Sequence, residues 1–512
     1  MKKIIAVVLA AVMLFSICVT GFAAQKDVTP VIVVGGVGCR GYYMDAGTEN
    51  EVSVFPPTVD VKYIVIQVLT GIAKTILTGN LDFTSQMAAN ILESVFDGFM
   101  CNADGDSKYE NVGSIYYPLS IDNYDFDFEN DVPEAAIAGT AAKAVGAENT
   151  YFYNYDWRLD PLANADRLNE TVENAKAKAG SDKVTLIPCS MGGVQTLSYL
   201  AKYGSDSVEK IIFMSSAHKG LYFVSELFSG NLQLSQKDIF KYLSDFLNLG
   251  DENTDNLFDF LCAYLGNAWY LKPVFSFLDK FAKDISNETV YDSLRRVFGS
   301  MPGMWAFVRS EYYDGARAFM TTDKTSAALL SKIDNYHKTV GSVNDSILTS
   351  AAEKGTAICI CSHYGRGSIP VTPKACIEGD YLIETASTSN GVTIADAGKY
   401  LPDGYTQAKE CGGHNHVSAD GKADASTCLF PDSTWLLKNV GHVGCNYGSD
   451  YADMLLWMLE TEGQPTVFDN EKYPQFLKAS MDENKLEPIT ADSKVTLKNG
   501  FKAFINYITE VI

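Results

Sequence analysis

Residues 184–193 read Val184-Thr-Leu-Ile-Pro-Cys-Ser190-Met-Gly-Gly193, an apolar run that gives way to a helical pattern over residues 191–203. When a buried strand turns sharply into a helix, the turn can lift a serine to the carboxyl end of the sheet, provided that small neighbours avoid clashes. The two glycines meet this condition, whereas Pro188 stands where a G-x-S-x-G motif has its first glycine. The stretch predicts a nucleophile elbow at Ser190, the alternative being an ordinary strand-to-helix loop.

Similar apolar runs recur along the chain and alternate with amphipathic helical patterns. The strand-like runs cover residues 31–34, 151–154, 184–187, 210–214, 356–361, 381–383 and 435–437. The helical patterns cover residues 163–179, 191–203 and 451–459. Apolar strands that alternate with helices are typical of a mostly parallel sheet with helices on both faces. The expected fold class is therefore α/β.

Two segments interrupt this alternation, at about residues 60–100 and 221–350. Both read as helices rich in Ile, Val, Leu and Phe, and neither shows a repeat period. They can form an ordinary helical subdomain, a cap whose apolar inner face covers a binding cleft, or both at once. We expect one α/β domain over residues 24–512, enlarged by these two helical insertions.

The composition describes a folded, acidic protein. Of the 512 residues, 46% are hydrophobic and 20% charged, which is enough apolar surface to build a core. The formal net charge of -22 argues against a nucleic-acid partner, because phosphate recognition needs a basic face. The acidic balance equally disfavours binding to anionic membranes, although an apolar patch could dock on a neutral lipid surface.

The first 23 residues have the pattern of a secretory signal peptide. A basic start at Lys2 and Lys3 is followed by an apolar run over residues 4–19 and by small residues near Ala23. We expect cleavage after Ala23 and a secreted, extracellular protein; a lipoprotein anchor at Cys18 and a retained membrane helix are the alternatives. Outside the cell disulfides can persist.

Ten of the 11 cysteines follow the predicted signal peptide. Cys411 and Cys428 bracket a polar, Gly-rich loop and are the best candidates for one disulfide, whereas Cys359 and Cys361 alternate along an apolar strand and fit buried thiols. The histidines of residues 411–416 lack paired CxxC or HExxH spacing, so we expect a loop there and no metal site.

A glycine-rich loop, Gly35-Gly-Val37-Gly-Cys-Arg-Gly41, follows the strand-like run at residues 31–34. Its G-x-G-x-x-G spacing matches a dinucleotide-binding fingerprint, but that motif needs an immediate helix, and residues 42–57 have no helical period. We therefore expect no cofactor. The better interpretation is an oxyanion loop, in which the N–H of Val37, or of Gly36 as the alternative, acts together with the N–H of Met191.

Four stretches occur in a characteristic order: Thr29-Pro-Val-Ile-Val-Val-Gly-Gly-Val37, Tyr155-Asp-Trp-Arg-Leu159, Ile187-Pro-Cys-Ser190-Met-Gly-Gly193 and Ser300-Met-Pro-Gly-Met-Trp305. Together they resemble the lecithin:cholesterol acyltransferase-like lipases of the α/β-hydrolase superfamily. The resemblance covers most of residues 29–462 and implies an α/β-hydrolase fold, a Ser-His-acid triad and an acyl-ester substrate, usually a lipid. The chain departs from the family at Gly35, where proline is usual, and at Pro188-Cys189, where Gly-His is usual.

The chain order of such a triad is serine, acid, histidine. His442 lies late in the chain, in a loop after the run at residues 435–437, and is our candidate base. His218 and His363 precede every candidate acid in the chain; we interpret His218 as structural and keep His363 as the alternative base.

The acid is predicted from the residues between the serine and the histidine. The family places an aspartate where this chain has Asn390, which cannot carry the charge. Glu384 ends the run at residues 381–383, where a strand would deliver an acid, and is our first choice; Asp396 is the alternative, and both fit surface carboxylates.

These features lead us to expect a secreted serine hydrolase that cleaves carboxylic esters of acyl lipids through an acyl-enzyme at Ser190. Transfer to an alcohol instead of water would make it an acyltransferase. The expected partners are the acyl-ester substrate and, through the cap, a lipid surface in transient contact. The alternative is a non-catalytic lipid-binding protein with a degenerate triad, an interpretation favoured by Pro188 and Asn390.

Overall fold

The computed structural model describes most of the chain. The described residues are 28–37, 41–46, 48–55, 61–125, 134–246, 261–262, 264–370, 378–396, 399–442, 448–480 and 485–491. The predicted signal peptide, residues 1–23, lies outside them. Within these ranges, the structure contains no helix with the length and apolar character that a membrane span requires.

Eight strands form the central sheet, in the order β13-β12-β11-β8-β7-β6-β1-β5. Their bounds are β1 Val31–Val34, β5 Thr150–Tyr153, β6 Val184–Pro188, β7 Val208–Met214, β8 Ala357–Tyr364, β11 Thr434–Lys438, β12 Phe476–Ser480 and β13 Lys485–Pro488. Every neighbouring pair is parallel except β12 and β13. The predicted α/β fold is confirmed.

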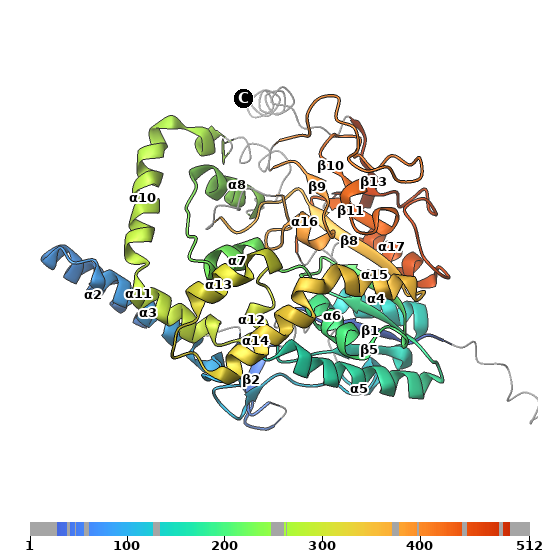
Figure 1. Cartoon of the computed structure of the whole chain (residues 1–512), viewed down its shortest axis with the longest axis horizontal. Helices are drawn as coiled ribbons and strands as arrows, with labels where there is room; N and C mark the ends of the chain where they lie inside the picture. Colours follow the sequence, from blue (N-terminus) through green and yellow to red (C-terminus); the bar gives the residue numbers. More distant parts are fainter. Residues whose placement is uncertain are drawn as a thin grey trace, which may run out of the picture.

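Helices pack on both faces of this sheet (Figure 1). On one face lie α5 (Pro161–Ala179) and α6 (Gly192–Tyr203), which share a buried cluster with Ile32 and Val34 of β1. On the other face α4 (Ala135–Val145) and α17 (Gly448–Glu460) share a second cluster with Val31 and Val33. Successive β1 side chains thus enter opposite clusters, which explains why the strands read as unbroken apolar runs.

The remaining helices lie mostly in the two segments expected to be helical insertions. The first contains α2 (Val61–Thr78) and α3 (Asp82–Phe96). The second contains α7 (Tyr222–Phe228), α8 (Gln236–Phe246), α10 (Lys272–Ile285), α11 (Glu288–Leu294), α12 (Pro302–Trp305), α13 (Tyr313–Met320), α14 (Ala327–Thr339) and α15 (Asn344–Glu353). The two segments meet where α11 packs on α3, and in Figure 1 α2 and α10 extend away from the sheet.

Short strands outside the central sheet complete the fold. An antiparallel sheet joins β2 (Tyr42–Met44), β3 (Val52–Phe55) and β4 (Val112–Gly113), while β9 (Thr393–Ile394) pairs with β10 (Ala423–Asp424). The strand predicted at residues 381–383 is wrong: these residues form bends, with Tyr381 at φ 83°. The disulfide predicted between Cys411 and Cys428 is also wrong, because both are free thiols.

The Tyr155-Asp-Trp-Arg run anchors the first insertion to the sheet. The Arg158 guanidinium is fully buried and pairs with Asp156 at 2.6 Å. It also donates to the carbonyl oxygens of Phe99, at 2.8 Å, and Val112, at 3.3 Å, which lie on either side of a turn in the insertion. The Ser300–Trp305 stretch packs here as well, since the Gly303 N–H donates to the Arg158 carbonyl at 2.9 Å. The Tyr155–Arg158 run and the Ser300–Trp305 stretch, which lie far apart in the sequence, therefore pack against each other at the edge of the first insertion.

Candidate active site

Ser190 occupies a strained turn between β6 and α6. Its φ is 49°, in the left-handed region that costs a non-glycine residue roughly 1–3 kcal/mol. Neighbouring backbone holds it there: the Ser190 N–H donates to the Met214 carbonyl at 3.3 Å, and the Ala217 N–H donates to the Ser190 carbonyl at 2.8 Å. The geometry matches the elbow expected from the sequence.

The two glycines after this turn are required by close packing. A Cβ on Gly192 would lie 2.1 Å from the Val34 carbonyl oxygen, and a Cβ on Gly193 would lie 1.7 Å from Ser216 Oγ. Pro188 is also accommodated, because it is the last residue of β6, and the ladder resumes where the Cys189 N–H donates to the Val34 carbonyl at 3.0 Å. The departure from G-x-S-x-G therefore leaves the turn intact.

Ser190, His442 and Asp380 form one hydrogen-bonded chain. The Ser190 hydroxyl lies 2.9 Å from His442 Nε2, and His442 Nδ1 lies 2.9 Å from Asp380 Oδ2. The three residues follow β6, β11 and β8, whose carboxyl ends lie at the same edge of the parallel sheet. The structure thus brings together Ser190 and His442, the serine and the base predicted from the sequence.

Asp380 takes the place expected for Glu384 or Asp396. Its carboxylate is fully buried, and Oδ1 accepts the Leu382 and Ile383 N–H groups at 3.0 and 2.7 Å. Oδ2 accepts from the Ser215 hydroxyl as well as from His442. These four donors fix the carboxylate with one oxygen against the imidazole.

Neither carboxylate chosen from the sequence contacts His442. Glu384 is buried and accepts from the Tyr222 N–H and the Ser368 hydroxyl, both at 3.1 Å. Burial raises its pKa to about 7, against the opposing effect of these donors. Asp396 instead pairs with Lys399 at 2.7 Å on the surface. The prediction was wrong because residues 381–383 are not a strand and so do not deliver Glu384 to the sheet edge.

The electrostatics of the chain favour a charged imidazole beside a charged carboxylate. Burial lowers the pKa of His442, but the charge and hydrogen bond of Asp380, together with the charge of Glu134, outweigh it and raise the pKa above its ordinary value. Burial raises the pKa of Asp380, and the charge and hydrogen bond of His442 with the Ser215 hydroxyl reverse this, so the pKa falls below its usual range. The pair is therefore suited to accept the serine proton.

The backbone N–H groups expected to bind the oxyanion differ in whether they already have an acceptor. The Gly36 N–H donates to Glu134 Oε1 at 2.9 Å and is already occupied. Among the described residues, no acceptor pairs with the backbone N–H of Val37 or of Met191. Met191 directly precedes α6, where the helix dipole favours negative charge. The geometry thus favours Val37 over Gly36.

The other histidines near this edge of the sheet are held by buried partners. His218 donates from Nε2 to the Asn390 side-chain oxygen and accepts the Ser216 hydroxyl at 3.0 Å, so Asn390 pairs with His218 instead of His442. His363 donates from Nδ1 to the Gly441 carbonyl at 3.0 Å, immediately before His442. Burial lowers the pKa of both imidazoles to about 4, so they stay neutral near pH 7. His363 thereby supports the loop that carries His442.

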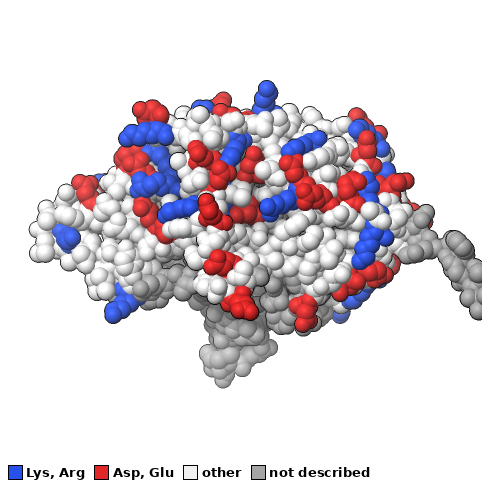
Figure 2. Space-filling model, turned by 90° about the horizontal axis from the view of Figure 1, so that it is seen from below, with Lys and Arg blue, Asp and Glu red and all other residues white. Residues whose placement is uncertain are grey.

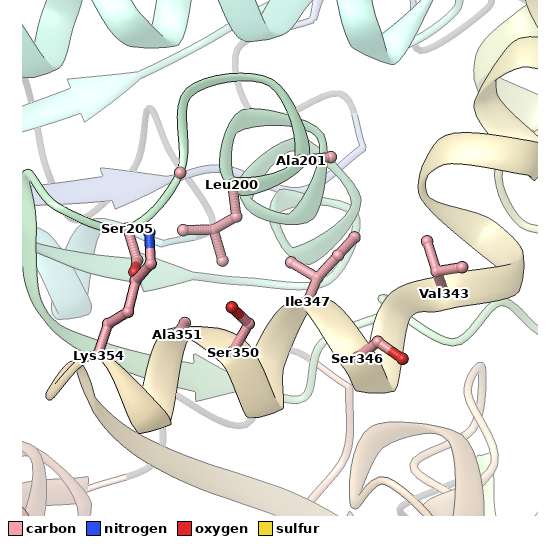
Figure 3. A pocket seen from close by; sticks show the side chains of 10 residues that line it. Leu200, Ala201, Ser205, Val343, Ser346, Ile347, Ser350, Ala351 and Lys354 are labelled. Carbon is pink, nitrogen blue, oxygen red and sulfur yellow. The ribbon is translucent and has the colours of Figure 1, made fainter.

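Sequence reasoning missed Asp380, Ser215 and Glu134, and it did not predict the supporting role of His363. A cue existed for Asp380, because an aspartate often starts a turn by accepting the N–H two residues on, as Asp380 does from Leu382. The described residues hold no group of three or more His, Cys, Asp or Glu side chains suited to a metal ion. A pocket of about 280 Å³ lies elsewhere, between α6 and α15 (Figure 3), and none of the three hydrogen-bonded residues lines it.

Comparison with known proteins leaves the family open. No family model and no curated protein matches the chain. Among solved structures, the chain is similar to a chain of the Tle4-Tli4 complex, with 11% identity, a TM-score of 0.25, and coverage of 65% of this chain and 75% of that one. It is also similar to the serine hydrolase CCSP0084 from the polyaromatic hydrocarbon-degrading bacterium Cycloclasticus zankles, with 14% identity, a TM-score of 0.14, and coverage of 41% and 81%. Both scores are too low to inform function.

Proposed function

We propose that the protein is a secreted serine hydrolase that cleaves carboxylic esters of acyl lipids. The observation that carries the proposal is the Ser190–His442–Asp380 chain, with 2.9 Å at each His442 nitrogen. Nucleophile, acid and base stand in the chain order of this class of hydrolase and come from the carboxyl ends of β6, β8 and β11. Secretion is proposed from the pattern of residues 1–23.

The geometry defines the proton route. Asp380 accepts a hydrogen bond from the Nδ1–H of His442, so the lone pair of Nε2 faces the Ser190 hydroxyl. As Ser190 Oγ forms a bond to the ester carbonyl carbon, its proton passes to Nε2, and the N–H groups of Met191 and Val37 bind the developing oxyanion. The imidazolium then protonates the departing alcohol. Water, deprotonated by the same histidine, then attacks the acyl carbon. The bond to Ser190 Oγ breaks, the carboxylic acid leaves, and the imidazolium returns its proton to Oγ.

The lipid part of the proposal is supported by exposed apolar side chains on the insertions. On α2 they include Ile76, 76% exposed, and Leu77, 84% exposed. Trp269, 78% exposed, begins the short 3-10 turn Trp269–Leu271 that leads into α10, and Phe277, on α10, is 65% exposed. Figure 2 shows few charged side chains at the end of the molecule that carries α2. Apolar surface of this kind fits contact with a neutral lipid surface and a role as a cap.

The serine can be tested with a fluorophosphonate probe, which labels activated serines covalently. We expect labelling of the wild type and its loss in Ser190→Ala and His442→Ala. Ser346→Ala, which removes a serine hydroxyl from the distant pocket of Figure 3, should label like the wild type. A wild type that stays unlabelled, or a Ser190→Ala variant labelled equally, contradicts the enzyme proposal and leaves a lipid-binding protein.

The preference for a lipid substrate can be tested by comparing the rates at which a soluble short-chain ester and an emulsified long-chain ester are hydrolysed. Phe277→Ser should slow hydrolysis of the emulsion by about tenfold to a hundredfold, since it removes an apolar contact of about 1.5–3 kcal/mol, and should spare the soluble ester. Lys280→Ser on the same helix is the matched control. Equal effects of Phe277→Ser on both substrates would contradict a lipid-facing cap.

The non-catalytic alternative loses its two supporting features in this structure. Pro188 ends β6 without disturbing the elbow, and Asn390 belongs to the His218 pair and lies outside the hydrogen-bonded chain of Ser190. No observation on the described residues favours that alternative over a hydrolase.

A further inference from the structure

The peptide group between Gly35 and Gly36 directly precedes Val37, the residue whose N–H the geometry favours as an oxyanion donor. The carbonyl oxygen of this peptide accepts the Tyr155 hydroxyl at 2.9 Å. Its N–H donates to Glu134 Oε1, also at 2.9 Å. Both side chains are buried. Because a peptide group is planar, hydrogen bonds at its opposite ends fix the orientation of the whole group.

The loop needs such support because of its glycine beside the serine. A Cβ on Gly36 would lie 2.9 Å from Ser190 Cβ, so a side chain at this position would press on the nucleophile. Glycine avoids the clash, but its backbone is free to adopt many more conformations than that of any other residue. The orientation of this part of the loop therefore has to be fixed by groups from elsewhere in the chain.

The run of sequence that contains Tyr155 also contacts the chain on the other side of Val37. The Trp157 N–H donates to the Tyr42 hydroxyl at 2.6 Å. The central carbon of the Arg158 guanidinium lies 4.8 Å from the centre of the Tyr42 ring. One short stretch of the chain thus holds the residues before and after the expected oxyanion donor.

We propose that Tyr155 and Glu134 are positioning residues for ester hydrolysis, which hold the peptide before Val37 so that the Val37 N–H points to the place where the oxyanion forms. This inference rests on the proposed function, because the oxyanion is that of the ester at Ser190. It goes further by giving the Tyr155-Asp-Trp-Arg pattern a task in the reaction. An oxyanion donor acts mainly in the transition state, so a misplaced donor should lower kcat and leave KM nearly unchanged.

The first test is Tyr155→Phe, which removes one hydroxyl. On a soluble short-chain ester, kcat should fall by about tenfold to a hundredfold, with KM changed by less than about threefold. The expected loss is at or below that for removing an oxyanion donor outright, which is about a hundredfold to a thousandfold, because the donor is displaced and still present.

Tyr153→Phe is the matched control. The buried Tyr153 ring stacks on that of Tyr155, with 5.3 Å between the ring centres. Its hydroxyl also donates to a backbone carbonyl, but to that of Asn164 on α5, at 2.6 Å. The control therefore removes the same kind of buried hydrogen bond without touching the oxyanion loop, and it should keep the wild-type kcat. Urea denaturation checks that both variants fold.

A trifluoromethyl ketone gives a readout that a purely structural role would not change. Ser190 Oγ bonds to the ketone carbon, the serine proton passes to His442, and the ketone oxygen becomes an oxyanion. Its inhibition constant should rise in Tyr155→Phe by about the factor by which kcat falls. The corresponding trifluoromethyl alcohol has no carbonyl and forms no oxyanion, so its inhibition constant should stay the same.

Two variants of Glu134 test the other end of the peptide. Glu134→Gln and Glu134→Ala both remove the charge that acts on His442, but only glutamine keeps a side-chain oxygen that can accept the Gly36 N–H. The difference between them measures the hydrogen bond alone. We expect kcat of a folded Glu134→Ala to be at least about tenfold below that of Glu134→Gln.

The outcomes separate this inference from the proposed function. A folded Tyr155→Phe with wild-type kcat overturns the positioning role and leaves the hydrolase standing, and so does an equal loss in Tyr153→Phe. Equal kcat in the two Glu134 variants overturns it as well, and this pair decides if Tyr155→Phe does not fold. A wild type that neither hydrolyses the ester nor binds the trifluoromethyl ketone overturns the proposed hydrolase, and the positioning role with it.

Discussion

Replacing Asp380 by asparagine should abolish the proposed hydrolase activity by reversing the tautomer of the His442 imidazole. Oδ1 of Asp380 accepts two backbone N–H groups, from Leu382 at 3.0 Å and Ile383 at 2.7 Å. In Asp380→Asn only the side-chain carbonyl can accept them, so the NH2 group must face His442. Nδ1 then becomes an acceptor and the ring proton moves to Nε2, toward Ser190. The base loses the lone pair that takes the serine proton.

The size of the effect follows from this geometry. The variant removes both the correct tautomer and the charge that stabilises the imidazolium, while the elbow and the oxyanion donors remain. The equivalent change in a serine protease lowers kcat by about 10⁴-fold, which corresponds to about 5 kcal/mol of transition-state stabilisation. We expect a loss of that order in Asp380→Asn, with KM for a soluble ester changed by less than about threefold.

The assay is steady-state hydrolysis of a soluble short-chain ester, with thermal unfolding as a check on folding. Asp396→Asn makes the same chemical change on the surface, and Glu384→Gln makes the analogous change at the acid first expected from the sequence; both should stay within about tenfold of wild type. A folded Asp380→Asn that retains more than a tenth of wild-type kcat would refute the reasoning, as would an equal loss in Glu384→Gln.

Three further predictions concern pH, anchoring and packing. Because His442 must be neutral to act as base and its pKa is raised, kcat/KM should fall as the pH drops through a value above about 6.5; a midpoint below that contradicts the assignment. Arg158→Met leaves Asp156 buried and unpaired and should lower the free energy of unfolding by about 3–5 kcal/mol in urea denaturation, less when Asp156→Leu is added. Gly193→Ala should cost about 1–3 kcal/mol of stability and weaken fluorophosphonate labelling, because its Cβ would lie 1.7 Å from Ser216 Oγ; full labelling at an unchanged melting temperature argues against it.

Ser190 and His442 could be predicted because the residues next to each in the sequence carry a recognisable pattern. Ser190 stands between an apolar strand and two glycines, and the close contact of Gly192 with β1 shows why those residue types are needed. His442 follows β11, whose apolar residues identify the strand before the loop. In both cases the strand that positions the residue directly precedes it, so a short window of sequence holds the information.

Asp380 and Glu134 have no such pattern. The apolar residues 381–383 read as a strand by composition, but Asp380 draws them into bends by accepting two of their N–H groups, and Tyr381 adopts φ 83°. Which carboxylate then reaches His442 depends on where β8 and β11 lie in the sheet. Glu134 is buried only because Gly36 and Ser190 come to it from elsewhere in the chain. Burial that arises from tertiary contacts leaves no periodicity to detect.

The strained turn at Ser190 has a consequence for the chain before it folds. Ser190 and His442 are 252 positions apart, and the contacts that hold φ at 49° come from β1 and from the chain at the end of β7. No local segment can assemble this arrangement, so in the unfolded chain the serine has only the ordinary weak reactivity of an alcohol. The geometry that would activate the serine therefore exists only once the long-range pairings of the sheet have formed.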